Sequence, residues 1–161
     1  MQGILGISLG TSDLGFAFLS YGSLTKWNVK TFPGEWNAGK LRLIINSIRP
    51  YVINADVDAL AVKIPEELMH LSLGMMQLIG AVNVLVEQMG IQIHYYSLSD
   101  LKLFHASDVC INKKVLFECV IRKYPDLYGV YQKEQKANRA YYGKLFEAVA
   151  TAHVCYKQQF D

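Results

Sequence analysis

A chain of 161 residues is long enough to bury one hydrophobic core, and we expect a single domain that spans residues 1–161. Hydrophobic residues make up 52% of the chain and charged residues 19%, a composition that excludes an intrinsically disordered protein. The net charge of only +2 gives no global electrostatic reason to bind nucleic acid, so a basic binding surface must be local.

The chain has no sequence features of an exported or membrane protein, and we expect it in the cytoplasm. Its first two residues are uncharged, whereas a signal peptide begins with basic residues. The longest apolar run, residues 78–86, contains Asn83 and is too short to span a bilayer. The odd number of cysteines and their spacing predict reduced thiols, without a disulfide or a metal site. The cysteines are Cys110, Cys119 and Cys155.

Residues 4–34 predict an antiparallel meander of three strands. Apolar runs at residues 4–9 and 15–20 are separated by a glycine-containing turn, and residues 24–32 alternate well enough for a third strand. Turn residues join the second strand to the third, and a Pro-Gly pair ends the unit.

The remainder predicts strands separated by helices. A helical face at residues 41–48 ends near Pro50, and the apolar run at residues 57–64 predicts a buried strand. Pro65 begins a long helix, and a strand follows at residues 91–96. Further along, the sequence predicts a helix capped by Asn112 and ended by Pro125, an irregular loop at residues 126–137, and a last helix from about residue 138.

This order predicts an α/β protein with a mixed five-stranded sheet, in which parallel strands extend the meander and helices cover both faces. The order and the stretch ILGISLGTSDLGFAFL, residues 4–19, resemble the RNase H-like fold of RuvC-type Holliday junction resolvases. VDALAVKIP is similar to the family's fourth strand, and YGKLFEAVATAHVC is similar to its final helix. Residues 95–125 resemble the next strand and the segment that carries the family's lysines.

The resemblance implies an active site of four carboxylates that hold two divalent metal ions. This chain has Ser8, Lys63, Lys144 and Glu147 at the matching positions, so one carboxylate remains. An ammonium group at a metal position excludes a divalent cation by its charge and its volume. The resemblance therefore implies a degenerate site without an intact catalytic residue, a metal or a cofactor. We expect Lys63 or Lys144 to pair with Glu147, although a one-residue register slip would turn Lys63 to the other sheet face.

A segment near residues 121–144 interleaves basic and aromatic side chains. Lysine and arginine neutralise phosphates, and tyrosine rings stack on unpaired bases. A solvated basic loop whose tyrosines pack beneath it, or form a dimer contact, is an equally good interpretation. The predicted nucleic-acid-binding residues are Lys113, Lys114, Arg122, Lys123, Tyr128, Tyr131, Lys133, Lys136 and Arg139.

The favoured function is binding of branched or single-stranded nucleic acid without metal-dependent cleavage. One alternative is an active magnesium-dependent endonuclease that uses relocated acids, for which Asp13, Glu66 and Glu67 are the candidates. Another is a protein-interaction module without nucleic acid. The resemblance also implies a homodimer built around the long helix that starts near Glu66. Away from these features, Lys40 and Lys102 are expected to face solvent.

Overall fold

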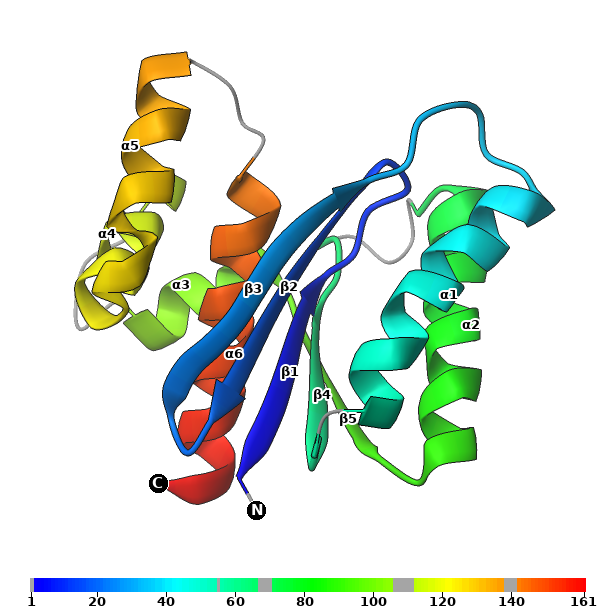
Figure 1. Cartoon of the computed structure of the whole chain (residues 1–161), viewed down its shortest axis with the longest axis horizontal. Coiled ribbons are helices and arrows are strands. Elements are labelled where there is room, and N and C mark those ends of the chain that lie inside the picture. The colour runs from blue at the N-terminus through cyan, green and yellow to red at the C-terminus, as the bar shows by residue number, and fades with distance from the viewer. Residues whose placement is uncertain (1, 55, 67–70, 106–111, 138–141) are drawn as a thin grey trace.

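The computed structural model contains a five-stranded mixed sheet with helices on both faces (Figure 1). The strands are β1 (Gly3–Ser8), β2 (Asp13–Ser20), β3 (Ser23–Thr31), β4 (Ala59–Lys63) and β5 (Gln92–Tyr96). They lie in the order β3-β2-β1-β4-β5, with antiparallel pairing from β3 to β1 and parallel pairing from β1 to β5. The predicted sheet is confirmed. The structure describes residues 2–54, 56–66, 71–105, 112–137 and 142–161.

The helices divide between the two faces of the sheet (Figure 1). On one face lie α1 (Ala38–Asn54) and α2 (Leu73–Met89). On the other face lies α6 (Gly143–Phe160), and further helices pack around it. These are α3 (Leu98–His105), α4 (Lys113–Lys123), the 3₁₀ helix η2 (Pro125–Leu127) and α5 (Tyr128–Ala137).

Side chains of β1 alternate between the two faces, as the period of a strand requires. Ile4 packs in the cluster that includes α6, whereas Leu5 and Ile7 pack in the cluster that includes α1 and α2. Ser8, four residues after Ile4, therefore points towards α6.

Two glycines let α6 lie directly against the sheet. A Cβ added at Gly6 would clash with the carbonyl oxygen of Ala148, and one added at Gly15 would clash with that of Lys144. Because these obstacles are backbone atoms, a larger residue would displace the helix. The close approach brings the first turns of α6 to the ends of β1 and β4.

Two helix boundaries differ from the prediction. α1 continues past Pro50, because Pro50 lies on its exposed side and Val52 beyond it packs in the core. α2 begins well after Pro65, because Ser72 caps it by accepting a hydrogen bond from a backbone amide of the first turn. Residues 67–70, where the prediction placed the first turn of this helix, lie outside the described residues.

Two helices lie where none was predicted. α3 begins at a pair in which Ser97 and Asp100 each accept a hydrogen bond from the other's backbone amide. The prediction of a loop at residues 126–137 is wrong, because η2 and α5 occupy the segment and bury Leu127 against the core. The predicted start of the last helix lies outside the described residues, and α6 itself begins at Gly143.

No helix in the described part of the chain is both long enough and apolar enough to cross a membrane. Cys119 and Cys155 are free thiols, and Cys155 lies in the core. Cys110 lies outside the described residues.

Candidate functional site

The carboxyl ends of two neighbouring strands meet the first turns of α6. Ser8 and Lys63 are register partners at the ends of β1 and β4. Lys144 and Glu147 are three residues apart on α6, so their side chains lie on the same side of the helix. Lys113, the first residue of α4, joins them by contacting Glu147. We call these five residues the substituted centre.

Glu147 is the hub of the substituted centre, and its side chain is only 3% exposed. Ser8 Oγ donates a hydrogen bond of 2.6 Å to Glu147 Oε2. Lys63 Nζ lies 3.3 Å from the same oxygen, and Lys113 Nζ lies 2.8 Å from Oε1. Lys63 therefore faces the centre, a question that the sequence left open.

The surrounding cations keep Glu147 ionised in spite of its burial. Burial by itself raises the pKa of this carboxyl group. The charge of Lys63, the hydrogen bonds from Lys113 and Ser8, and the charge of Lys144 outweigh burial and lower the pKa to about 2. Glu147 therefore carries a negative charge throughout the physiological pH range.

Lys144 is the cation that Glu147 does not pair with directly. Its Nζ donates a hydrogen bond of 3.1 Å to the carbonyl oxygen of Leu9. Burial lowers the pKa of Lys144, Glu147 opposes this shift, and Lys63 and Lys113 add to it by repulsion. Two ammonium groups thus pair with one carboxylate while the third binds a backbone carbonyl oxygen, and the five residues of the substituted centre are together net positive.

This donor set does not fit a pair of divalent metal ions. Magnesium and manganese sites of this kind need several carboxylate oxygens. The centre offers the carboxylate of Glu147 alone, and both of its oxygens already contact an ammonium group or a hydroxyl. Among the residues that the structure describes, no three His, Cys, Asp or Glu side chains gather as metal ligands would.

Of the three acids of the nuclease alternative, the structure describes Asp13 and Glu66, and these two belong to different segments of the fold. Glu66 Oε1 accepts a hydrogen bond of 2.5 Å from the backbone amide of Ser99, at the start of α3. Asp13 begins β2 two residues before Gly15, so it points to the sheet face that α6 covers. Glu67 lies outside the described residues.

The predicted nucleic-acid-binding residues lie on α4 and α5, which pack beside α6 (Figure 1). All of those described are exposed except Tyr131, which is half-buried and packs its ring 5.9 Å from that of Phe146. Arg139 lies outside the described residues. We call the basic residues of these two helices the basic surface: Lys113, Lys114, Arg122, Lys123, Lys133 and Lys136.

The basic surface concentrates charge that the rest of the chain lacks. Residues 113–137 contain six basic and three acidic residues, whereas the other residues of the chain contain ten basic and eleven acidic ones. One of the six is partly engaged, because Lys123 Nζ lies 3.0 Å from Nε2 of the buried His153. Burial and the charge of Lys123 lower the pKa of His153 to about 3, so its ring is neutral and accepts the hydrogen bond from Lys123.

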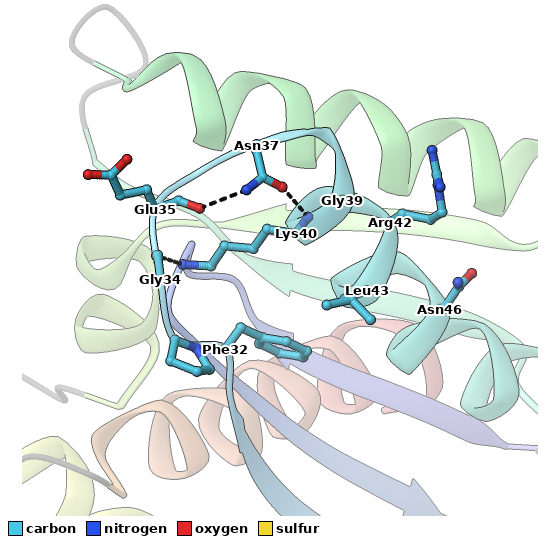
Figure 2. A pocket seen from close by; sticks show the side chains of 10 residues that line it. Phe32, Gly34, Glu35, Asn37, Gly39, Lys40, Arg42, Leu43 and Asn46 are labelled. Atoms are coloured by element: carbon cyan, nitrogen blue, oxygen red, sulfur yellow. Dashed lines mark hydrogen bonds between the residues drawn. The ribbon is translucent and has the colours of Figure 1, made fainter.

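A separate hollow of about 590 Å³ lies on the α1 side of the sheet, between the segment after β3 and the start of α1 (Figure 2). Lys40 reaches across it and donates a hydrogen bond of 2.7 Å to the carbonyl oxygen of Gly34. Lys40 is only 7% exposed, so the prediction that it faces solvent is wrong. Lys40 of α1 therefore connects the helix to the loop that follows β3.

Lys102, which was also expected to face solvent, is half-buried.

The chain resembles known proteins in its fold, whereas comparisons of its sequence found no match. No protein-family model and no curated protein matches the chain. RuvC of T. thermophilus in complex with Holliday junction substrate superposes with a TM-score of 0.77 at 19% identity, over 98% of this chain and 94% of RuvC. The Thermus thermophilus RuvC structure gives a TM-score of 0.72 at 19% identity, over 97% and 94% of the two chains.

The chain has a RuvC-like fold. The predicted RNase H-like architecture is therefore confirmed over nearly the whole chain. At 19% identity the similarity to RuvC establishes the fold alone. That Ser8, Lys63, Lys144 and Glu147 occupy the metal-binding positions of RuvC-type resolvases stays a prediction. The sequence does not predict the contact of Lys113 with Glu147, because no local pattern indicates that α4 packs against α6.

Proposed function

We propose that this chain binds branched or single-stranded nucleic acid and does not cleave it through metal ions. Three features support the proposal. The fold is that of RuvC, which has been described in complex with a Holliday junction substrate. The basic surface concentrates positive charge beside α6. The substituted centre is net positive, whereas a metal-dependent nuclease needs several negatively charged ligands.

The observation that carries the proposal is the engagement of Glu147. Its two oxygens contact Ser8, Lys63 and Lys113, so a metal ion would have to displace ammonium groups from the one carboxylate of the centre. Lys113 is also half exposed. Its ammonium group can therefore contact a phosphate, and the attraction needs no metal.

Binding and cleavage assays with a four-way junction test the proposal. We expect equal affinity in EDTA and in magnesium at matched ionic strength, affinity that falls steeply with added salt, and no cleavage with magnesium or manganese. Cleavage that disappears in Glu147→Gln would establish the nuclease alternative instead. Failure to bind any nucleic acid at low salt would leave the protein-interaction module.

The salt dependence also locates the surface that binds. In Lys133→Gln/Lys136→Gln, two cations of the basic surface are lost, and we expect the slope of log affinity against log salt to fall by about 2. Arg42→Gln/Arg49→Gln is the matched control, because both arginines are exposed on α1 at the other face of the sheet. The control should leave the slope unchanged; equal effects of the two double variants would show that the charge acts only globally.

A further inference from the structure

A hollow of about 460 Å³ opens among the helices that carry the basic surface. It lies between α4, η2 and α5, and its lining is mainly apolar. The residues that line it are Glu118, Ile121, Arg122, Pro125, Tyr128 and Tyr131. None of them belongs to the substituted centre.

The floor of the hollow is fixed by the core. Ile121 is 8% exposed, and the ring of Tyr131 packs edge-on against Phe146 of α6, with 5.9 Å between ring centroids. Burial and the neighbouring Glu118 raise the pKa of the Tyr131 hydroxyl, so the two side chains lie close together. A ligand would therefore meet a preformed surface, which lowers the entropic cost of binding.

Tyr128 also lines the hollow, and about half of it is open to solvent. It is 55% exposed although it is large and aromatic, and it opens α5. Arg122 of α4 also lines the hollow and is exposed. An exposed aromatic face beside a guanidinium group is an arrangement on which nucleobases stack.

The charges in and around the hollow favour a base inside it and a phosphate outside it. Glu118 places a carboxylate in the hollow, which repels a phosphate but accepts hydrogen bonds from the amino group of a base. Apart from Arg122, the residues of the basic surface do not line the hollow, although they lie on the same two helices. A nucleotide fits this pattern with its base inside and its backbone on the rim.

We infer that the hollow takes one unpaired base of a nucleic acid whose backbone lies on the basic surface, with Tyr128 stacked on the face of that base. This inference rests on the proposed function, because it names the part of the ligand that one subsite holds. It assigns the hollow to single-stranded or unpaired nucleotides and not to fully paired duplex.

Fluorescence anisotropy with a short oligodeoxycytidylate, whose bases carry the amino group that Glu118 would accept, and with a duplex of equal length tests the inference. Tyr128→Ala should weaken single-strand binding by about 10-fold, whereas Tyr128→Phe should bind like the wild type, because stacking needs the ring and not the hydroxyl. Duplex binding and the salt slope should stay unchanged in Tyr128→Ala, since the ring contacts no phosphate. A single 2-aminopurine in the oligonucleotide should lose fluorescence on binding to the wild type and keep it with Tyr128→Ala.

The matched control is Tyr21→Asn, which removes a tyrosine of similar exposure from the turn between β2 and β3. Tyr21 has a φ of 51°, a conformation that asparagine tolerates, so the control should fold and bind normally. Equal loss of single-strand and duplex binding in Tyr128→Ala, or no loss, would overturn the base site alone. Absence of all binding by the wild type would overturn the proposed function and the base site together.

Discussion

Glu147 keeps its charge inside the protein because its neighbours compensate for the water that it has lost. A buried carboxylate without partners costs several kcal/mol, and an ion pair that loses one member leaves the same cost behind. Lys63 and Lys113 come from β4 and α4, so the carboxylate also connects elements that are distant in sequence. This residue should therefore matter for stability even if it performs no chemistry.

We expect Glu147→Gln to lower the free energy of unfolding by about 3 kcal/mol at pH 7. The pKa of Glu147 is about 2 in the folded chain and 4.5 without perturbation. A depressed pKa of an acid stabilises the folded state fully above pH 4.5, and this contribution disappears as the pH falls towards 2. Urea unfolding at a series of pH values measures the difference between wild type and variant, which should shrink over that interval.

Glu35→Gln provides the comparison, because Glu35 is exposed and has no ion pair among the described contacts. It should unfold like the wild type at every pH. A Glu147→Gln variant as stable as the wild type at pH 7 would mean that the lysines do not hold this carboxylate.

At the scale of elements, the contact between α6 and the sheet determines whether the substituted centre forms. Gly6 and Gly15 leave no room for a side chain, and the backbone of α6 occupies the space. The helix therefore approaches closely enough for Glu147 to reach the hydroxyl of Ser8 at the end of β1.

Gly6→Ala should destabilise the fold by about 1–3 kcal/mol or more, because the added methyl group meets the backbone of α6. Thermal and urea unfolding measure this loss. Gly129→Ala is the matched control, since nothing lies within 4 Å of a Cβ at Gly129 on α5. That variant should be as stable as the wild type or slightly more stable, because alanine favours a helix. Equal stability of the two variants would contradict the close packing of α6.

Apolar runs, alternation and turn residues predicted the sheet, because these features lie within each strand and its flanking turns. The alternation in β1 also determined which face Ser8 points to. α3 was missed although Ser97 and Asp100 form a capping pair at its start. α5 was missed because its polar composition hides the burial of Leu127 just before it. Lys113 was predicted only as a nucleic-acid-binding residue; its pairing with Glu147 could not be predicted, because it depends on how α4 packs beside α6.

At the scale of the whole molecule, α2 presents an apolar stripe to solvent. Leu73, Met76 and Val84 are each at least half exposed, and Gly80 lies between them with open space beside it. Their spacing of three, four and four residues places them on one side of the helix. This stripe is where the expected homodimer would form, and Gly80 would let a second helix approach.

We expect a dimer at micromolar concentration and a monomer after Met76→Glu/Val84→Glu, because buried glutamates oppose association. Sedimentation velocity measures both states. Leu43→Glu/Ile53→Glu makes the same chemical change at exposed positions of α1 and should leave the dimer intact. A wild-type chain that sediments as a monomer at tens of micromolar would refute the dimer.

The hydrogen bond between Ser8 and Glu147 joins residues that are 139 positions apart. A ribosome makes β1 long before it makes α6. During synthesis, the side of the central strand that α6 later covers is therefore exposed. Contacts of such long range slow folding, and unpaired apolar strands are prone to associate with other chains. Production of this protein in cells should therefore depend on chaperones that shield the nascent meander until α6 emerges.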